Sequence, residues 1–393
     1  MKRQLIITKT EQKVITTLME NNVVVEMHCA DYMQDGSMVL GNVYIGKIKN
    51  IVANINAAFV EIAPGIECYY PLDEAVRPIF TNKVGKKAFC IGDELVVQIS
   101  REALKTKALS VTGKLSFTGK YAVLTYGDTR IGVSAKIPKV KKEELQQLVK
   151  PYTDEEYGII LRTNAKDAKS TDILSEIETL IAEYKKLKQT ASTRVCFSCL
   201  KKAPATYLAE LKNVYQEGLE EIVVEDKILF SEIEDYLKQY QPDDLQKLRL
   251  YEDKLLPLHK LYGIEKHLED ALKERVWLKS GAYLVIQPTE ALTVIDVNTG
   301  KCISKKKEDE TYYKLNLEAA KEAARQIRLR NLSGIILIDF INMKSNEYKE
   351  MLLCNFRTYL QTDPVETVLV DMTKLELVEI TRKKIRKTLK ETV

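Results

Sequence analysis

The stretches LTVIDVN, at residues 292–298, and GIILIDFIN, at residues 334–342, decide most of what can be predicted about the fold. Each stretch is short, rich in β-branched residues and almost continuously apolar up to its aspartate. This pattern is typical of a central strand that is covered on both faces of its sheet. We therefore predict two buried strands in the last third of the chain.

The segment between these stretches has the periodicity of an amphipathic helix. Its apolar residues recur at spacings of four and three, which places them on one helix face: Tyr313, Leu317, Ala320, Ala324 and Ile327. Strand, helix, strand is the crossover that makes two parallel strands neighbours. The carboxyl ends of both strands should therefore lie at the same edge of one sheet.

Both predicted strands end in a carboxylate, Asp296 in the first and Asp339 in the second. A carboxylate at the end of a buried strand is costly to ionise without a cation or a hydrogen-bond donor beside it. Two such groups at one sheet edge suit Mg²⁺, which binds one or two carboxylates and keeps several waters. A simpler alternative stays open, in which one aspartate caps a turn and the other pairs with an arginine or lysine.

The composition excludes little but does limit the class of protein. A length of 393 residues suggests roughly two to four domains, and 45% hydrophobic with 30% charged residues is ordinary for a globular protein. The net charge of +4 does not by itself indicate nucleic-acid binding. Its distribution is uneven, since residues 101–150 hold eleven Lys/Arg against four Asp/Glu, and residues 217–235 hold eight acids against one lysine. This division could present a positive face to a polyanion, although solvated helix faces explain most charge runs.

Hydropathy and cysteine usage predict a soluble cytoplasmic protein. No apolar segment approaches the roughly 18 residues of a membrane span, and the apolar run in MKRQLIITKT is too short for a signal peptide. The seven cysteines have no framework spacing, which fits a reducing cytosol. Cys196 and Cys199 have CxxC spacing, but a zinc site needs a second pair and none of the three histidines is placed to supply it.

The rest of the chain divides by pattern. Residues 1–37 contain short strand-like runs and predict a sheet whose other strands come from elsewhere. Residues 38–118 contain short, glycine-interrupted strands at regular spacing, which predicts a small barrel of the OB type that binds nucleic acid. From Gly119 strands and helices are mixed, with a long charged helix from Thr171 to about Gln189, and residues 220–272 predict a strand and then mostly helix.

The chain resembles the ribonuclease E/G family from about residue 1 to residue 389. The paired IDVN and IDF motifs, with an arginine-rich helix between them, are highly specific to that family. The segments that carry the resemblance are VWLKSGAYLVIQPTEALTVIDVNTGK, LNLEAAKEAARQIRLRNLSGIILIDFINM and LELVEITRKKIRKTL.

The resemblance implies an α/β protein of several subdomains. An RNase H-like subdomain would be split between residues 1–37 and 208–272. An OB-type RNA-binding barrel would be inserted at residues 38–118, and a sensor of the RNA 5′ end would follow at residues 119–207. A DNase I-like catalytic subdomain would occupy residues 273–393.

The resemblance also implies roles for residues at matching positions. Asp296 and Asp339 match magnesium ligands, and Asn298 matches a further catalytic residue. The other matches are Arg162 and Thr163, which would hold a 5′-monophosphate, and Phe59, Tyr69 and Lys107, which would grip single-stranded RNA. The residue types fit these roles, because an aromatic ring that stacks on a base contributes roughly 1–3 kcal/mol and arginine can bind a phosphate through two hydrogen bonds. Phe59 or Tyr69 considered alone is more typical of barrel core than of a stacking platform.

The chain departs from the family pattern in three places. The CPxC zinc-link is absent before the last residue, Val393, so we expect no zinc and, if a homo-oligomer forms, one without that link. Asn342 stands where many relatives have a second aspartate, which could reshape the metal site. Glu366 lies where relatives often carry a basic residue, so one contact with the RNA backbone is in doubt.

Together these observations favour a cytoplasmic, Mg²⁺-dependent endoribonuclease that cleaves single-stranded RNA, prefers 5′-monophosphorylated substrates and acts in rRNA processing and mRNA decay. Further contacts to RNA could come from Lys301 and from Arg325, Arg328 and Arg330 on the intervening helix. Two alternatives stay open: a non-catalytic RNA-binding relative with a degraded assembly region, and a metal-dependent DNA nuclease.

Overall fold

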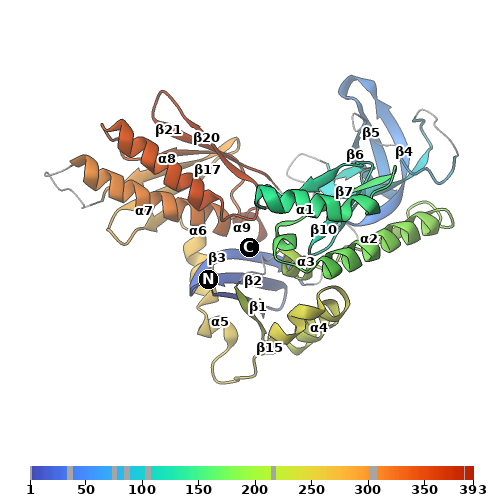
Figure 1. Cartoon of the computed structure of the whole chain (residues 1–393), viewed down its shortest axis with the longest axis horizontal. Helices are drawn as coiled ribbons and strands as arrows, with labels where there is room; N and C mark the ends of the chain where they lie inside the picture. The colour runs from blue at the N-terminus through green and yellow to red at the C-terminus, as the bar shows by residue number, and fades with distance from the viewer. Residues whose placement is uncertain are drawn as a thin grey trace. The chain divides into compact units, whose positions relative to one another are not determined.

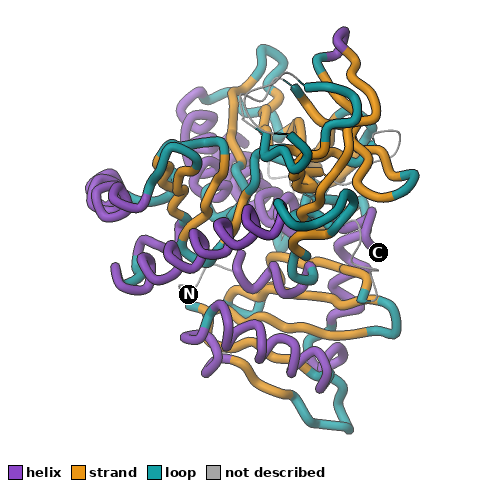
Figure 2. Tube along the Cα trace, turned by 90° about the vertical axis from the view of Figure 1, so that its right-hand side faces the viewer, coloured by secondary structure: helices purple, strands orange, loops and turns teal. Residues whose placement is uncertain are grey.

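The computed structural model describes residues 2–32, 39–72, 78–83, 89–101, 108–213, 218–300, 308–384 and 386–393 (Figure 1). The chain is a mixed α/β protein with two compact units. The first unit comprises Met1–Met33, Glu217–Leu237 and Asp243–Val393, and the second comprises Gln34–Gln216 and Lys238–Pro242. Figure 2 shows the helices and strands after a turn of 90°.

The first unit contains a sheet built from two segments that lie far apart in the sequence. Its strands lie in the spatial order β15 (Leu248–Leu250), β14 (Leu219–Val224), β1 (Arg3–Lys9), β2 (Lys13–Glu20) and β3 (Val23–Asp31). Strand β1 pairs in parallel with β14, so the prediction that the first strands need partners from elsewhere in the chain is confirmed. The helices that follow β14 in sequence are α4 (Lys227–Tyr240), α5 (Leu258–Leu261) and α6 (Ile264–Leu272). Leu258, Ile264 and Ala271 from α5 and α6 pack with Ile6 and Met27 of this sheet.

A second sheet in the same unit contains the stretches LTVIDVN and GIILID. Its strands lie in the order β16 (Arg275–Trp277), β17 (Tyr283–Pro288), β18 (Leu292–Asn298), β19 (Gly334–Asp339), β21 (Leu377–Arg382) and β20 (Thr367–Met372). Strands β18 and β19 are parallel, and helix α7 (Glu308–Leu329) connects them. The predicted strand–helix–strand crossover is confirmed.

Only one face of this sheet is covered by helices in the described part of the chain, so the prediction of strands buried on both faces is wrong. Ile295, Ile336 and Ile338 pack in one core with residues of α7 and of α8 (Asn346–Leu360). On the other face Ile335 is 51% exposed and Val368 is 47% exposed. Apolar residues occupy both faces of these strands, which is why their runs are continuous, but apolar character alone does not determine which face receives helices.

The predicted apolar stripe of the crossover helix is partly confirmed. Ala320, Ala324 and Ile327 are buried in α7, whereas Tyr313 and Leu317 are half-buried. The buried stripe is broader than predicted and also includes Leu315, Ala319 and Ala323. Small alanines allow the helix to lie close to the sheet.

The second unit contains the predicted barrel. Five strands close on themselves in the order β4 (Val43–Val52), β5 (Ala57–Ala63), β6 (Ile66–Pro71), β8 (Ser110–Thr112) and β7 (Glu94–Arg101), with β7 pairing back to β4. Strand β13 (Cys199–Lys201) adds to the outside of β4. Gly46 in β4 leaves no room for a side chain, since a Cβ there would lie 2.4 Å from a methyl group of Val60. The closed, OB-like barrel matches the prediction from regular short strands.

A smaller sheet with two helices completes the second unit. Its strands lie in the order β11 (Ile131–Val133), β12 (Tyr157–Leu161), β10 (Ala122–Tyr126) and β9 (Ser116–Thr118). Helix α1 spans Lys139–Val149, and the predicted long charged helix is α2 (Ser170–Ala191). Ile173, Ile177 and Leu180 of α2 are buried at spacings of four and three. They form one apolar stripe that packs in a common core with residues of the sheet. The remaining helices are α3 (Thr206–Asn213) in this unit and α9 (Leu389–Thr392) in the first.

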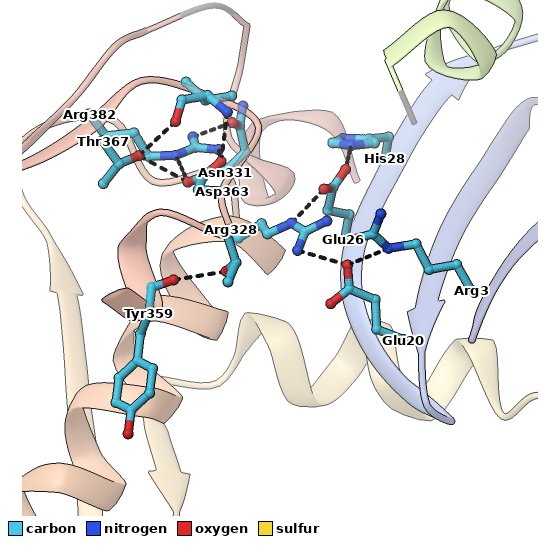
Figure 3. Close-up of polar contacts among 12 residues, drawn as sticks. Arg3, Glu20, Glu26, His28, Arg328, Asn331, Tyr359, Asp363, Thr367 and Arg382 are labelled. Carbon is cyan, nitrogen blue, oxygen red and sulfur yellow. Dashed lines mark hydrogen bonds and ion pairs between the residues drawn. The ribbon is translucent and has the colours of Figure 1, made fainter. Parts of the chain in front are cut away.

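The arginines of α7 hold the first unit together. Arg328 is 7% exposed, and its guanidinium donates to Glu26 at 2.5 Å and to Glu20 at 3.1 Å (Figure 3). Arg330, the first residue after α7, is equally buried and donates to the Gln326 side chain at 2.6 Å. The Arg328 contacts join the crossover helix to strands β2 and β3.

Arg328 and Arg330 are buried, so the suggestion that they hold RNA is wrong for these two. Arg325 is half-buried, and its suggested role stays a prediction. Arg325 pairs with Glu322 and donates to the Val24 carbonyl at 2.7 Å, and Arg330 also donates to the Lys273 carbonyl at 2.7 Å. Lys301, the fourth suggested contact, lies outside the described residues.

The charge of Arg328 also lowers the pKa of Glu26. Burial by itself would raise the pKa of Glu26, but the Arg328 charge and a hydrogen bond from His28 outweigh burial and hold that pKa far below its usual range. Glu26 is therefore ionised at neutral pH inside the protein, where its charge is compensated by Arg328.

A second buried network lies in the sheet that carries Asp296 and Asp339, beside the pair formed by β19 and β21. Arg382, at the end of β21, donates to Asp363 at 2.7 Å and to the side chain of Asn331 at 2.6 Å (Figure 3). Asn331 follows α7 and has a left-handed φ of 51°, which asparagine tolerates better than most residues. This network ties the turn that leads into β19 to its antiparallel neighbour β21.

In the part of the chain that the structure describes, no helix has both the length and the hydropathy that crossing a bilayer requires.

Replacing Arg328 by methionine should lower the free energy of unfolding by about 3–5 kcal/mol, because Glu26 would stay buried without its arginine and Glu20 would keep only Arg3. Urea denaturation followed by circular dichroism measures the loss. Arg357→Met is the matched control, since Arg357 is exposed on α8 and its removal should change stability by less than about 0.5 kcal/mol. Equal losses in the two variants would contradict a structural role for the buried arginine.

Candidate functional site

The two aspartates meet at one edge of the sheet, as predicted. The parallel register of β18 and β19 pairs Asp296 directly with Asp339. Adjacent strands lie about 4.8 Å apart, so the carboxylates are neighbours on the same face. Both side chains are exposed.

The face that carries them is the one opposite the helices. Successive side chains of a strand point to opposite faces, and the neighbours Ile295, Val297 and Ile338 are buried in the core with α7 and α8. Asp296 and Asp339 therefore lie on the open face, where water or a ligand can reach them.

The carboxylates influence each other electrostatically. Partial burial and the negative charge of Asp296 both raise the pKa of Asp339. The side-chain amide of Asn298 donates to Asp296 at 2.6 Å. Among the described residues, neither aspartate forms an ion pair with an arginine, lysine or histidine, so the alternative in which one of them does so is not supported.

The arrangement fits a hard divalent cation. Two carboxylates in register provide oxygen ligands, and a cation between them would relieve the repulsion that raises the pKa of Asp339. The described residues contain no group of three or more His, Cys, Asp or Glu side chains that could hold a metal. A cation held by two carboxylates alone would keep several waters, a pattern that Mg²⁺ accepts.

The loop after β19 is held by side chains of the crossover helix. Asn316, fully buried in α7, donates to the Ile341 carbonyl at 2.7 Å and accepts from the Ile341 amide at 3.0 Å. Asp309, in the first turn of α7, accepts from the backbone amides of Lys344 and Ser345. Asn342 is exposed within this fixed loop, three residues after Asp339.

Phe59 and Tyr69 form a pair on the barrel of the second unit. They are register partners on β5 and β6, with ring centroids 6.5 Å apart at an edge-to-face angle of 80°. Both are half-buried, while Val60 and Tyr70 beside them belong to the barrel core. The rings therefore lie outside that core, which makes the core alternative for them wrong. Lys107 lies outside the described residues.

Arg162 and Thr163 directly follow strand β12. Arg162 donates to the Gly119 carbonyl at 2.7 Å, and the hydroxyl groups of Thr163 and Ser134 lie 2.9 Å apart. Both residues are half-buried at the end of the strand.

The loop that receives Arg162 is itself held in place. The carboxylate of Glu176 on α2 accepts hydrogen bonds from three consecutive backbone amides, at 2.7–2.8 Å, those of Lys120, Tyr121 and Ala122. These bonds fix the loop whose Gly119 carbonyl binds Arg162. A preorganised guanidinium and hydroxyl thus lie together at the end of β12.

The sequence analysis missed three residues on the same sheet face as the aspartates. Arg275 and Trp277 on β16, together with Tyr283 on β17, form a cluster of one cation and two rings. The alternation of Arg275 and Trp277 in the segment RVWLK was a signal for one strand face.

Glu366, by contrast, is exposed just before β20 and has no described link to the aspartates.

Comparisons with known proteins agree on one family. A model described as the ribonuclease E/G family matches residues 116–385. The chain is 31% identical to ribonuclease G of Haemophilus influenzae over 98% of this chain and 80% of that protein. It is 29% identical to ribonuclease G of Escherichia coli strain K12 over 99% of this chain and 81% of that protein. Ribonuclease E of Synechocystis is 31% identical over 89% of this chain and 53% of its own length.

Mg²⁺ should raise the melting temperature of the protein by a few degrees, because binding between Asp296 and Asp339 occurs only when the strands are paired. In Asp339→Asn this rise should disappear. Differential scanning calorimetry with and without Mg²⁺ measures the effect. Glu350→Gln, which removes an exposed carboxylate from α8, is the control and should keep the full rise. A full Mg²⁺ effect in Asp339→Asn would exclude this carboxylate pair as the binding site.

Proposed function

Since the chain belongs to the ribonuclease E/G family, we propose that it is a Mg²⁺-dependent endoribonuclease that cleaves single-stranded RNA in RNA processing and decay. The observation that carries the proposal is the direct pairing of Asp296 with Asp339 on an open sheet face. The proposal places the protein in the cytoplasm, a compartment that suits its free cysteines.

Asp296 and Asp339 would hold the metal, and Asn298 would keep Asp296 oriented through their hydrogen bond. When bound, Mg²⁺ supplies an activated water and neutralises charge on the scissile phosphate. The amide of Asn298 would also position the water or the phosphate. In the reaction a water oxygen bonds to phosphorus, the bond from phosphorus to one ribose oxygen breaks, and that oxygen takes up a proton.

The geometry favours catalysis over binding alone. Two exposed, adjacent carboxylates repel the phosphates of RNA, so a protein that only bound RNA would gain nothing from the pair formed by Asp296 and Asp339. This repulsion argues against a non-catalytic RNA-binding relative. The barrel aromatics and the arginine–threonine pair argue for RNA rather than duplex DNA as the substrate.

The barrel would grip the RNA strand. Phe59 and Tyr69 present half-exposed rings outside the barrel core, and such rings stack on bases with little regard to sequence. Lys107 would bind an adjacent phosphate.

The pair formed by Arg162 and Thr163 would recognise a 5′-monophosphate. The guanidinium can donate to phosphate oxygens in charge-assisted hydrogen bonds, and the hydroxyl can add one more. The bonds from Glu176 keep the supporting loop in place before RNA arrives. A triphosphate would be too bulky for such a site, and a 5′-hydroxyl would leave it empty.

The subdomain assignment is part of the same proposal. Residues 1–37 and 208–272 would form an RNase H-like subdomain, residues 38–118 the RNA-binding barrel, and residues 119–207 the 5′ sensor. Residues 273–393 would form a DNase I-like catalytic subdomain. The sheet that joins β1 to β14 supports the split of the first of these.

Asp339→Asn and Asp296→Asn should each lower the cleavage rate of a short AU-rich RNA by roughly a hundredfold or more, because each removes a metal ligand. Affinity for the RNA should stay the same or increase, since a negative charge facing the phosphates is lost. Gel assays with and without Mg²⁺ measure cleavage, and fluorescence anisotropy measures binding. Glu350→Gln should cleave at the normal rate. Normal cleavage by Asp296→Asn in limiting Mg²⁺ would refute the metal assignment.

Cleavage of a 5′-monophosphorylated RNA should exceed that of the same RNA with a 5′-hydroxyl by about tenfold, the effect of one or two charge-assisted hydrogen bonds. Arg162→Ala should remove this difference while leaving the rate on the 5′-hydroxyl RNA nearly unchanged. Arg194→Ala removes one exposed charge from the same unit and should preserve the difference. Equal rates on the two RNAs in the unmodified protein would mean that the sensor does not operate.

A further inference from the structure

Three side chains form a compact cluster at the β16 edge of the second sheet, with the two rings tilted by 54° rather than stacked; we call this cluster the stack. The ring centroids of Trp277 and Tyr283 are 5.0 Å apart, and the Arg275 guanidinium lies 4.6 Å from the Tyr283 centroid and 5.8 Å from the Trp277 centroid. Such contacts between a guanidinium and aromatic faces are attractive and limit the motion of all three groups. Trp277 is therefore in contact with both Tyr283 and Arg275 without a ligand.

The strand register places this stack beside the carboxylates and on their face. Trp277 pairs with Tyr283, and Tyr283 pairs with Asn298. In the next row on that face, Arg275 pairs with Val285, Val285 with Asp296, and Asp296 with Asp339. Directly paired residues point to the same face, and the two inter-strand spacings from β16 to β18 correspond to about 10 Å.

The exposure of Trp277 is the observation that the fold does not explain. Its side chain is 63% exposed, although an indole ring gains much more stability from burial. Arg275 is exposed as well. Tyr283 and Arg275 thus contact Trp277, while most of the residue remains available to a flat ligand.

We propose that Trp277, supported by Tyr283 and Arg275, is a stacking platform for a nucleobase of the RNA strand close to the scissile phosphate. The proposal rests on the proposed function, because it places the strand across the carboxylate face. A base offers a π-face of any sequence to the indole ring, and the Arg275 charge would offset part of the repulsion between RNA and the two aspartates. A protein partner on this aromatic surface is the competing occupant, but it would gain nothing from the alignment with Asp296 and Asp339.

The chain contains a single tryptophan, so its fluorescence reports Trp277 alone. The experiment titrates full-length Asp339→Asn, which should bind without cleaving, with a short single-stranded RNA. Stacking of a base on the indole should quench the emission, and the quenching should saturate at the same RNA concentration as fluorescence anisotropy of a labelled RNA.

Substitutions test the contribution of the ring to affinity. In the same background, Trp277→Ala should weaken RNA binding by about five- to hundredfold, the range for one stacked base, whereas Trp277→Phe should keep most of the affinity. Val368→Ala removes an exposed apolar side chain from the far edge of the same sheet face and should change affinity by less than twofold.

Unchanged emission at saturating RNA, or an affinity change below twofold in Trp277→Ala, would overturn the platform. The titration of the unmodified tryptophan decides the question even if Trp277→Ala does not fold. Failure of the proposed function is a separate result: it would appear as absence of Mg²⁺-dependent cleavage by the unmodified protein. Cleavage that is lost in Asp339→Asn, together with unmoved Trp277 emission, would leave the nuclease proposal standing and remove the platform.

Discussion

The parallel, in-register pairing of β18 with β19 is the constraint on which the candidate site depends. It places Asp296 beside Asp339, so two like charges share one edge of a sheet and the pKa of Asp339 rises. A shift of the register by one residue would turn one carboxylate into the core that packs on α7 and α8. The hydrophobic core on one face of the sheet therefore determines that both acids remain together on the other face.

Helix α7 serves this arrangement in three ways. Its length and apolar stripe make the crossover that leaves β18 and β19 parallel. Its polar side chains fix the loop after β19, through the buried Asn316 and through Asp309. Its buried Arg328 joins the helix to Glu20 and Glu26 of the other sheet in the same unit. The acids on the open face are thus supported by a helix that never reaches that face.

The sequence was a good guide to elements and a poor guide to the orientation of charged residues. Periodicity predicted the crossover, the small barrel and the long helix α2, because alternation and helical spacing are local properties. Arg328 was misassigned because its partners come from a distant part of the chain. Arg328 has the residue type and the setting of a phosphate contact, yet Glu20 and Glu26, some 300 positions away in sequence, bury it as a structural cation.

The sequence by itself determined the two acid-terminated strands, the connection that makes them neighbours and the family to which they belong, since each of these is carried by local pattern or by motifs. Only the tertiary structure decided which sheet face remains open, and that Trp277, Tyr283 and Asn298 form one row across it. The physical reason is that side chains alternate between the two faces of a strand, and the sequence of the strand does not show which face will be covered. Pairing with distant strands and packing against helices then determine which side chains are buried and which can meet a ligand.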